Sequence, residues 1–276
     1  MNAGFHRLAE TLRQSTGIVI DPTKRFALEA RLSSIAVARC HGDITAMLDS
    51  VRPGQKSDLL DEIVDAIATN ETFFFRDRSP FRLLAGEILS HLLTARAEQR
   101  EIRIWCNACS TGQEPYSVAM TLDQAGQKLA GWRVALHASD ISRTAVAAAR
   151  EGVYNQFEAQ RGTPTNFLLK YFTREGDNWR ISEQLRSKVR FSLFNLLSPF
   201  NEHRLYDVIF CRNVLIYFDV ETRRDILARL AKAIRPDGFL VLGATETIAS
   251  GDPNWITWSA NPLALVRTDG PFAPRS

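Results

Sequence analysis

The feature that most constrains the fold is an alternation, from Glu101 onward, of short apolar runs with segments of helical character. The apolar runs cover residues 102–106, 134–140, 189–194 and 206–211. Each run has the length of a buried strand. Helical segments between strands are typical of parallel sheets, because parallel neighbours need a long crossover connection. The alternation therefore predicts an α/β fold with a doubly wound, Rossmann-like sheet.

A further strand is predicted towards the end of this region. A helix is expected over residues 220–234, and Arg235-Pro-Asp-Gly238 follows it. Proline and glycine favour a turn after a helix. Residues 239–243 are apolar again, so we expect the sheet to resume there.

The N-terminal quarter of the chain lacks this alternation and is predicted to be helical. Leu28, Leu32 and Ile35 are spaced by four and then three residues, as on one face of a helix. Asp21 is a candidate helix cap, and Pro22 is tolerated in a first helical turn. The expected helices cover residues 4–15, 22–38, 44–51 and 57–68, with a further helix at residues 80–93.

These patterns predict two domains and one insertion. We expect a small all-helical domain at residues 1–76 and a larger domain at residues 77–276. Residues 154–188 are more than a helix and a turn require, and their pattern predicts a small inserted antiparallel β subdomain with a hairpin around Glu175-Gly-Asp-Asn178. Such an insertion is either a partner-binding element or a surface excursion, and the sequence leaves both open.

Composition places the chain among soluble globular proteins. Of its 276 residues, 45% are hydrophobic, which is enough to bury a sizeable core. No run approaches the roughly 20 apolar residues of a membrane-spanning helix, and the first 20 residues carry charges where a signal peptide would be apolar. We therefore expect a cytoplasmic protein without membrane insertion. The 34 basic residues are spread along the chain, so the net charge of +3 does not predict nucleic-acid binding.

The four cysteines do not form a metal-site pattern. Only Cys106 and Cys109 are close, as Cys-Asn-Ala-Cys, and neither a second pair nor histidines at ligand spacing accompany them. No metal is expected. A redox pair and two reduced thiols beside a buried strand both fit this spacing, and we favour the thiols.

Polar residues follow the predicted strands at the edge where an open parallel sheet binds ligands. After the first strand comes a loop of small residues, Ala108-Cys-Ser-Thr-Gly-Gln-Glu-Pro-Tyr116. Small residues let a ligand approach the backbone, and Pro115 opens a helix whose N-terminal amides favour a carboxylate. Glu114 faces the same crevice and can accept hydrogen bonds from an ammonium group.

The second and third strands also end in polar residues. Asp140 ends the second strand and can accept hydrogen bonds from two ribose hydroxyls, although it can also cap the helix at residues 142–150. The third strand ends in Asn195 and Leu196, which can meet an adenine through amide and apolar contacts.

The fourth strand ends in Arg212 and Asn213, and Tyr217 follows. An arginine or asparagine at this place can equally be a structural hydrogen-bonding residue. The recurrence of polar residues at successive strand ends favours a ligand site.

The pattern favours a nucleoside ligand without a diphosphate. The loop after the first strand has neither the Gly-x-Gly-x-x-Gly fingerprint of dinucleotide binding nor a phosphate-cradling lysine motif. S-adenosylmethionine fits better, because its adenine, ribose, carboxylate and ammonium groups match the four kinds of residue at the strand ends.

With these residues identified, the chain resembles the CheR family of chemotaxis-receptor glutamate methyltransferases, from about residue 17 to about residue 248. Five motifs in the family's order carry the resemblance. They are Asn70-Glu-Thr-Phe-Phe-Phe-Arg76, Ser110-Thr-Gly-Gln-Glu-Pro-Tyr-Ser117, Ala138-Ser-Asp-Ile141, Asn195-Leu-Leu197 and Phe210-Cys-Arg-Asn-Val-Leu-Ile-Tyr-Phe218.

The resemblance implies both a domain arrangement and a set of ligand contacts. It implies an N-terminal helical domain that lies over the cofactor and approaches the receptor, and it places Tyr217 close to the transferring methyl group. The cofactor contacts that it implies are Asn70, Thr72, Arg76, Glu114, Asp140, Asn195, Leu196, Arg212 and Asn213.

The chain departs from the family pattern in two places. Family members that grip a pentapeptide at the receptor's carboxyl terminus have a longer, glycine-richer hairpin loop than Arg174-Glu-Gly-Asp-Asn178. We therefore expect direct recognition of the receptor's helical cytoplasmic domain without a pentapeptide tether. The first loop reads Gly-Gln-Glu where Gly-Glu-Glu is common, so the cofactor role falls to Glu114. An arginine that the family places ahead of the first strand is Arg96, Arg100 or Arg103, and the choice stays open.

The reaction that the resemblance implies is in-line attack of a receptor glutamate carboxylate on the sulfonium methyl group, which yields a γ-methyl ester and S-adenosylhomocysteine. No general base is needed, because a glutamate with a pKa of about 4.3 is ionised at neutral pH. Two other functions compete with it. A nucleic-acid or small-molecule methyltransferase is disfavoured because the fourth strand leads into Arg-Asn-Val-Leu-Ile-Tyr and not into the Asn-Pro-Pro-Tyr of amino-group methylases. A non-catalytic S-adenosylmethionine-binding scaffold is disfavoured by the intact polar strand ends.

Overall fold

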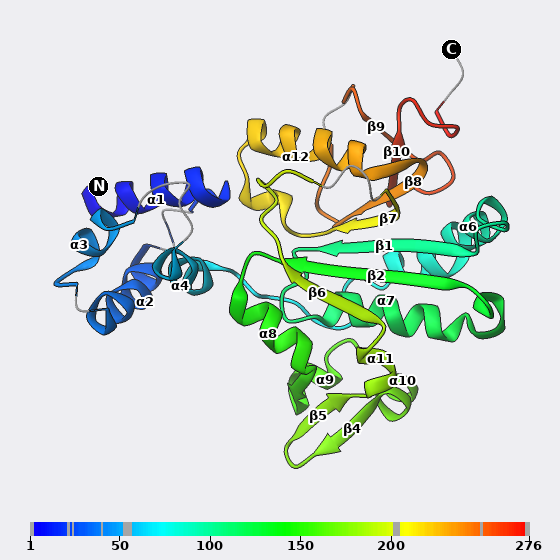
Figure 1. The fold of residues 1–276 in the computed structure, drawn as a ribbon, viewed down its shortest axis with the longest axis horizontal. Helices are drawn as coiled ribbons and strands as arrows, with labels where there is room; N and C mark the ends of the chain where they lie inside the picture. Colours follow the sequence, from blue (N-terminus) through cyan, green and yellow to red (C-terminus); the bar gives the residue numbers. More distant parts are fainter. Residues whose placement is uncertain are drawn as a thin grey trace.

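The computed structural model describes residues 3–20, 23, 25–39, 41–51, 57–200, 205–248 and 251–273. Its centre is a seven-stranded sheet, which Figure 1 shows together with the helices around it. The strands of this sheet are β1 (Glu101–Asn107), β2 (Arg133–Asp140), β6 (Val189–Leu193), β7 (Tyr206–Cys211), β8 (Ile234–Leu242), β9 (Trp255–Thr257) and β10 (Ala264–Arg267).

The sheet has the order β6–β2–β1–β7–β8–β10–β9. The first five strands in this order are parallel, and β10 and β9 extend the sheet with antiparallel pairing. The direction of the strand order reverses between β1 and β7, which is where doubly wound sheets place their ligands. The predicted Rossmann-like fold is therefore confirmed, while β9 and β10 were not predicted.

Helices cover both faces of the sheet, so its central strands are buried on both sides. Val208 and Phe210 of β7 pack in one hydrophobic cluster with residues of α7 (Gln113–Gln124). Ile209 and Cys211 alternate with them and pack in a second cluster with residues of α12 (Val220–Ala233). An unbroken buried run of this kind is typical of parallel strands. Figure 1 shows α7 and α12 on opposite sides of β7.

Residues 235–238 lie inside β8 (Ile234–Leu242), so the prediction of a separate turn between helix and strand was wrong. Tyr206 pairs with Ile234 and Val208 pairs with Phe239, so four residues of β8 stand opposite Asp207 alone. The proline and glycine therefore bend the strand locally without ending it. This excursion brings Asp237 within reach of Arg96.

The N-terminal helices form a separate small core. Leu8, Leu32, Met47 and Ile63 are almost completely buried in it. The predicted cap and first turn at residues 21 and 22 lie outside the described residues. The helices are α1 (Ala3–Thr16), α2 (Arg25–Ala38), α3 (Ile44–Asp49) and α4 (Asp58–Ile67).

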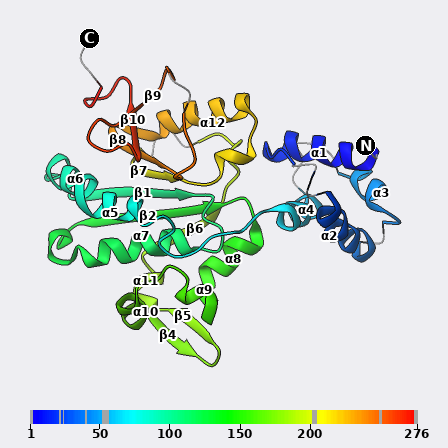
Figure 2. The ribbon, with the colours of Figure 1, turned by 180° about the vertical axis from the view of Figure 1, so that it is seen from behind.

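These helices lie beside the carboxyl ends of β1, β2 and β7 (Figure 1). The chain then returns along the sheet through α5 (Ser79–Leu83), a π-helical turn (Leu84–Ile88) and α6 (Leu89–Ala95). Figure 2 shows from behind that α6 lies at the opposite end of the sheet from the N-terminal helices. The domain division at residue 76 stays a prediction. Within the described residues, no helix is both long and apolar enough to span a membrane.

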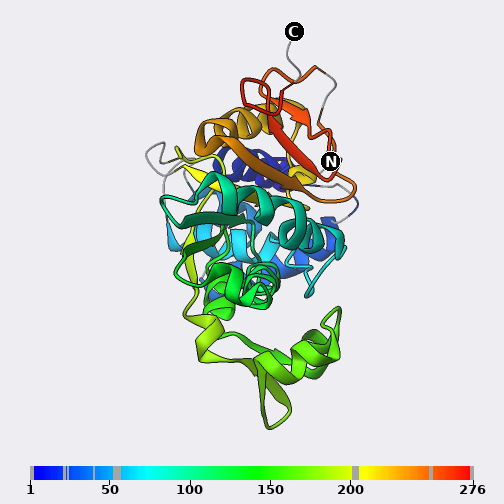
Figure 3. The ribbon, with the colours of Figure 1, turned by 90° about the vertical axis from the view of Figure 1, so that its right-hand side faces the viewer.

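The predicted insertion contains its own three-stranded antiparallel sheet. β4 (Phe172–Glu175) and β5 (Asn178–Ile181) form the expected hairpin, and β3 (Val153–Asn155) pairs with the other side of β5. This part projects from the body of the molecule in Figure 3. Its short helices are α9 (Gln156–Gln160), α10 (Thr165–Tyr171) and α11 (Glu183–Arg186), and α8 (Arg143–Glu151) precedes it.

Several hydrogen bonds join the N-terminal region to the parallel sheet. The Val19 amide donates to the Tyr217 carbonyl at 2.8 Å, and Ile18 forms an isolated β-bridge with Phe218. The Ser142 hydroxyl donates to Asp65 of α4 at 2.6 Å. These contacts hold the helical region against the edge of the sheet where the parallel strands end.

Candidate active site

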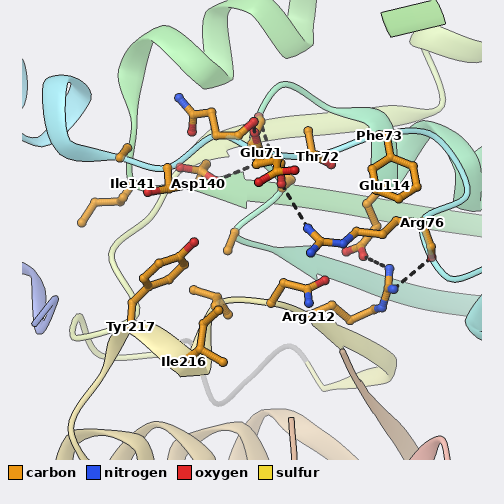
Figure 4. Close-up of a pocket in the computed structure, with 18 of the residues that line it drawn as sticks. Glu71, Thr72, Phe73, Arg76, Glu114, Asp140, Ile141, Arg212, Ile216 and Tyr217 are labelled. Atoms are coloured by element: carbon orange, nitrogen blue, oxygen red, sulfur yellow. Dashed lines mark hydrogen bonds and ion pairs between the residues drawn. The ribbon is translucent and has the colours of Figure 1, made fainter. Parts of the chain in front are cut away.

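A pocket lies at the carboxyl ends of β1, β2 and β7, between the sheet and the segment that follows α4 (Figure 4). Residues 68–73 form one wall, and residues 108–110 after β1 and 212–214 after β7 form another. The sequence-predicted site residues that line it are Asn70, Thr72, Arg76, Glu114, Asp140, Arg212, Asn213 and Tyr217. The fold thus brings residues from four separate motifs to one cavity.

The loop after β1 turns tightly against α8. Gly112 has a φ of +96°, and a side-chain carbon there would lie 3.0 Å from the Ala149 Cβ atom. Only glycine suits this conformation at this distance. The loop also joins two other pocket segments, because Ser110 donates its amide to Asp140 at 2.7 Å and its hydroxyl to the Asn70 carbonyl at 3.2 Å.

Asp140 is held at the end of β2 with its carboxylate facing the pocket (Figure 4). It is 7% exposed and accepts one hydrogen bond from the Ser110 amide and one from the Ser142 amide. Burial raises the pKa of the Asp140 carboxyl, and these two hydrogen bonds oppose the rise. The cap of α8 is Ser142, whose hydroxyl accepts from the Ala145 amide at 3.0 Å. The carboxylate of Asp140 therefore keeps acceptor capacity for a ligand.

Arg212 is the charged centre of the opposite wall. Its side chain is 1% exposed, and its Nη1 donates to Glu114 Oε2 at 2.7 Å while its Nη2 donates to Asp77 Oδ2 at 2.6 Å. Burial raises the pKa of the Glu114 carboxyl, although the guanidinium of Arg212 favours its ionised form. The buried Nε of Arg212 has no hydrogen-bond partner in the protein, so this wall retains an unsatisfied donor.

The segment that carries Arg76 is strained. Phe75, Asp77 and Arg78 have φ values of 52°, 67° and 47°, in the left-handed region that non-glycine residues rarely adopt. The Phe75 amide donates to the Ser117 hydroxyl at 2.9 Å, which anchors the turn to α7. Backbone strain that the surroundings hold in place is common at functional sites. Here it directs Arg76 into the pocket, opposite Tyr217 (Figure 4).

Tyr217 lies in a short 3-10 turn (Leu215–Tyr217) after β7. Its carbonyl accepts from the Val19 amide, and its ring extends towards the middle of the pocket in Figure 4. Ile216 beside it also lines the pocket and is 52% exposed, so this side of the pocket opens to solvent. Tyr217 therefore stands beside this open side, which is the entrance of the pocket.

Asn195 and Leu196 are not among the residues that line the pocket. The Asn195 amide donates to the Ser15 carbonyl at 2.8 Å, and its oxygen accepts from the Leu197 amide at 2.9 Å. Leu196 is 7% exposed and packs in the cluster beneath α12. In this conformation Asn195 supports the contact with α1 and Leu196 packs against the sheet and α12, and their adenine contacts stay a prediction.

Sequence reasoning missed several residues of the site. Ile18 lines the pocket from the N-terminal region, and no local pattern marks it. Cys109 and Ile141 also line it, next to residues that were predicted. Glu246 binds the backbone of the loop after β7, and it was overlooked although it follows strand 239–243 at the same sheet edge. The strand-end rule would have found it.

The cysteine pair near the pocket is buried. Cys106 and Cys109 are free thiols with at most 1% exposure, and burial raises the pKa of both well above the usual value. A thiol that stays protonated is a poor nucleophile. The burial therefore favours the interpretation of Cys106 and Cys109 as reduced thiols beside a strand over a redox pair. Among the described residues, no three histidine, cysteine, aspartate or glutamate side chains gather as a metal-binding group.

Comparison with known proteins identifies the family. A family model described as the CheR methyltransferase, SAM binding domain, matches residues 70–263, which include the five parallel strands and most of the residues that line the pocket. The chain belongs to the CheR methyltransferase family. Chemotaxis protein methyltransferase 1 of Pseudomonas aeruginosa is 37% identical over 253 residues, which cover 90% of this chain and 91% of that protein. The chemotaxis protein methyltransferase of Escherichia coli is 36% identical over 255 residues, with 90% and 85% coverage.

Membership of the CheR family makes this chain an S-adenosylmethionine-dependent methyltransferase. The pocket has the chemistry that this cofactor needs. Asp140 offers a carboxylate for hydroxyl donors, Glu114 offers one for an ammonium group, and the free Nε of Arg212 offers a donor for a carboxylate or another acceptor. The residues present therefore fit the cofactor of the family.

Proposed function

We propose that this CheR-family chain transfers a methyl group from S-adenosylmethionine to glutamate side-chain carboxylates of a methyl-accepting chemotaxis-type receptor. The products are a glutamate γ-methyl ester and S-adenosylhomocysteine. The observation that carries the proposal is a pocket of family-motif residues in a chain whose relatives, named chemotaxis protein methyltransferases, align with 90% of its length. A cytoplasmic location follows from this proposal, because the receptor helices that carry such glutamates would lie there.

The residues of the pocket take distinct proposed roles. Asp140 binds the ribose hydroxyls, and Glu114, held by Arg212, binds the amino-acid end of the cofactor. Asn70, Thr72 and Arg76 approach from the segment after α4, and Asn213 does so from the loop after β7. Asn195 and Leu196 at the end of β6 remain the proposed adenine contacts.

The chain has little covalent chemistry to perform. Bound S-adenosylmethionine supplies an electrophilic methyl group. A substrate glutamate is already ionised at neutral pH, so no residue has to remove a proton from it. The protein's tasks are to align the carboxylate and to exclude water. Tyr217 at the entrance orients the carboxylate through its hydroxyl, and residues 68–73 cover the pocket.

The proposed partner is the helical cytoplasmic domain of the receptor, recognised directly. The β4–β5 hairpin turns through only Gly176 and Asp177, and the Arg174 side chain donates to the Gly176 carbonyl at 3.1 Å. A turn this short supports recognition without a pentapeptide tether. Each esterification removes one negative charge from a helix surface, and this relaxes repulsion between like charges in the receptor.

Cofactor binding and methyl transfer are tested separately. The first experiment is calorimetric titration of the parent protein and of Asp140→Ala with S-adenosylhomocysteine. We expect binding by the parent and a loss of at least about tenfold in the variant, because a charged acceptor is removed. Asp43→Ala is the matched control, since Asp43 also accepts a backbone amide, from Ala46 at 2.8 Å, but lies at the start of α3. It should bind normally.

The second experiment uses radiolabelled S-adenosylmethionine and a purified receptor cytoplasmic fragment. We expect base-labile methyl incorporation that disappears when the accepting glutamates are replaced by alanine and persists when the last five receptor residues are removed. Binding of S-adenosylhomocysteine without any incorporation would contradict esterification and favour a cofactor-binding scaffold. Loss of incorporation on removing the five residues would contradict recognition without a tether.

A further inference from the structure

The Glu246 carboxylate accepts four backbone hydrogen bonds at the edge of the pocket. Its Oε2 accepts from the amides of Asn213 at 2.6 Å and Gly243 at 2.8 Å. Its Oε1 accepts from the amides of Val214 at 3.0 Å and Leu215 at 2.8 Å. Three of these donors are consecutive residues of the loop that leaves β7. A single side chain therefore satisfies three consecutive amides of that loop.

Three consecutive amides do not converge on one point in a strand or a regular helix. Here Asn213 has a φ of +58°, which turns its amide towards those of the next two residues. Converging amides form a concave site for an anion, and a charged acceptor makes stronger hydrogen bonds than a neutral one. The carboxylate of Glu246 is thus the anion around which the loop is shaped.

The loop shaped in this way carries the pocket residues of β7. Arg212 stands before the three amides, Tyr217 stands after them, and Asn213 and Val214 line the pocket directly. The side chain of Arg212 has separate supports in Glu114 and Asp77. The contacts with Glu246 therefore act on Asn213 and on the turn that leads to Tyr217.

Gly243 lets Glu246 come this close. A side-chain carbon at Gly243 would lie 2.7 Å from Glu246 Oε2 and 2.8 Å from the Asn213 side-chain nitrogen. Contacts under 3.0 Å force a displacement. The end of β8 and the loop after β7 are therefore packed so that the carboxylate fits between them and any added methyl group would push it away.

We propose that Glu246 is a positioning residue, which sets the loop at residues 212–217 in the shape that binds the cofactor. The proposal rests on the proposed function in one respect, that Asn213 contacts the cofactor. Glu246 acts through the backbone and does not itself belong to the residues that line the pocket. Glu246 affects ligand binding because its hydrogen bond to the Asn213 amide sets the direction of the Asn213 side chain.

The test is Glu246→Gln, measured first without ligand. Glutamine has the same shape but only one acceptor oxygen, so its amino group must face two of the four backbone donors. We expect hydrogen exchange at the amides of residues 213–215 to rise by at least about tenfold and S-adenosylhomocysteine binding to weaken by about tenfold or more. The control is Asp252→Asn. Asp252 accepts the amides of Asn254 and Trp255 in a turn away from the pocket, and its variant should bind normally.

A double-mutant cycle separates positioning from general stabilisation. If Glu246 acts through Asn213, then Glu246→Gln weakens binding much less in an Asn213→Ala background than in the parent. Additive effects on binding would overturn the proposal, and so would unchanged exchange or unchanged affinity in Glu246→Gln. Gly243→Ala, which displaces the same carboxylate, should reproduce both changes if Glu246→Gln does not fold. Failure of the parent to bind S-adenosylhomocysteine would contradict the proposed function, while the exchange experiment would still decide whether Glu246 holds the loop.

Discussion

The two ends of the parallel sheet bury the same kinds of charged residue in different ways. At the amino end, Arg96 donates to Asp207 Oδ1 at 2.7 Å and to both oxygens of Asp237, at 2.6 and 2.8 Å. Asp207 also accepts from the Arg103 amide at 2.7 Å. Burial raises the pKa of Asp237, but the hydrogen bond and charge of Arg96 outweigh it and lower that pKa.

At the carboxyl end, the effect of burial on the carboxyl pKa values exceeds the effect of hydrogen bonds and opposite charges. Burial holds the pKa of Glu114 and of Asp140 above the ordinary value in spite of their partners, and the Arg212 Nε has no partner. Arginine and aspartate side chains at the amino end pair with one another and hold α6, β7 and β8 together, although the buried His91 Nε2 and Arg235 Nε there make no hydrogen bond in the protein. At the carboxyl end, burial makes the ionised forms of Glu114 and Asp140 costly, and both residues line the pocket. Carboxyls whose pKa is raised in a cleft are candidates for a functional site, whereas the lowered pKa of Asp237 comes from an ion-pair network that joins elements of the fold.

The largest effect that would test this contrast is loss of stability at the amino end. Arg96→Met removes the buried partner of Asp207, which is 1% exposed, and leaves it only the partly exposed Arg235, at 3.2 Å, as an ion-pair partner. We expect the free energy of unfolding to fall by about 3 to 5 kcal/mol, measured by urea denaturation, with unchanged S-adenosylhomocysteine affinity in the folded protein. Arg133→Ala removes an ion pair to Glu101 from a side chain that is 73% exposed, so it should cost less than about 1 kcal/mol. Equal losses in the two variants would remove the distinction.

A change at the carboxyl end should act on binding and spare stability. Glu114→Gln removes a buried charge that is already costly to keep, so relief of desolvation offsets the lost ion pair with Arg212. We expect S-adenosylhomocysteine affinity to fall by about tenfold to a hundredfold in calorimetry, while the free energy of unfolding at pH 7 changes by less than about 1 kcal/mol. A stability loss as large as that of Arg96→Met would show that Glu114 belongs to the scaffold.

The pH dependence of Glu114 has a definite sign. Because its folded pKa is raised, the carboxyl contributes stability at pH values below its unfolded pKa, and this contribution is lost as pH rises through the folded pKa. Urea titrations across this range should therefore show a smaller decline of stability with rising pH in Glu114→Gln than in the parent.

Tyr217→Phe should affect the rate alone. The phenol hydroxyl orients the substrate carboxylate in the proposed mechanism, and its loss leaves the ring in place at the pocket entrance. We expect kcat to fall by about tenfold in the methyl-transfer assay, with unchanged S-adenosylhomocysteine affinity. Tyr171→Phe removes a hydroxyl bonded to Asp123 at 3.0 Å, far from the pocket, and should leave kcat unchanged. A weaker cofactor affinity in Tyr217→Phe would contradict a role restricted to the substrate.

The smallest expected effect concerns Asp123, a carboxylate that belongs to neither end of the parallel sheet. Burial raises the pKa of Asp123, but Lys188, Lys170 and Tyr171 together lower it from 3.8 to about 2. A lowered pKa means that its stabilisation is present above pH 3.8 and is lost as pH falls through about 2. In Asp123→Asn, the free energy of unfolding should therefore fall less steeply between these pH values than in the parent, as measured by urea denaturation. Asp177→Asn in the exposed hairpin turn changes the net charge equally and should keep the slope of the parent.

Much of the fold was predictable because strand and helix patterns are local. The runs at 102–106 and 134–140 became β1 and β2 with at most one extra residue at each end. Local patterns failed where a long-range contact decided the outcome. Residues 235–238 look like a turn, yet pairing with β7 and the contact of Asp237 with Arg96 keep them within a strand. Arg96, which makes this contact, is 8% exposed and is the buried one of the three arginines ahead of or within the first strand, Arg96, Arg100 and Arg103.

By itself the sequence determined the parallel sheet and the polar residues at its carboxyl edge, because the side-chain period of a strand and the place where it ends are written in neighbouring residues. Tertiary structure alone decided which residues meet there. It turned Asn195 towards Ser15, brought Ile18 to the pocket and set Glu246 under the loop after β7. These contacts join residues that are far apart in the chain, and packing geometry, which no local pattern encodes, selects among them.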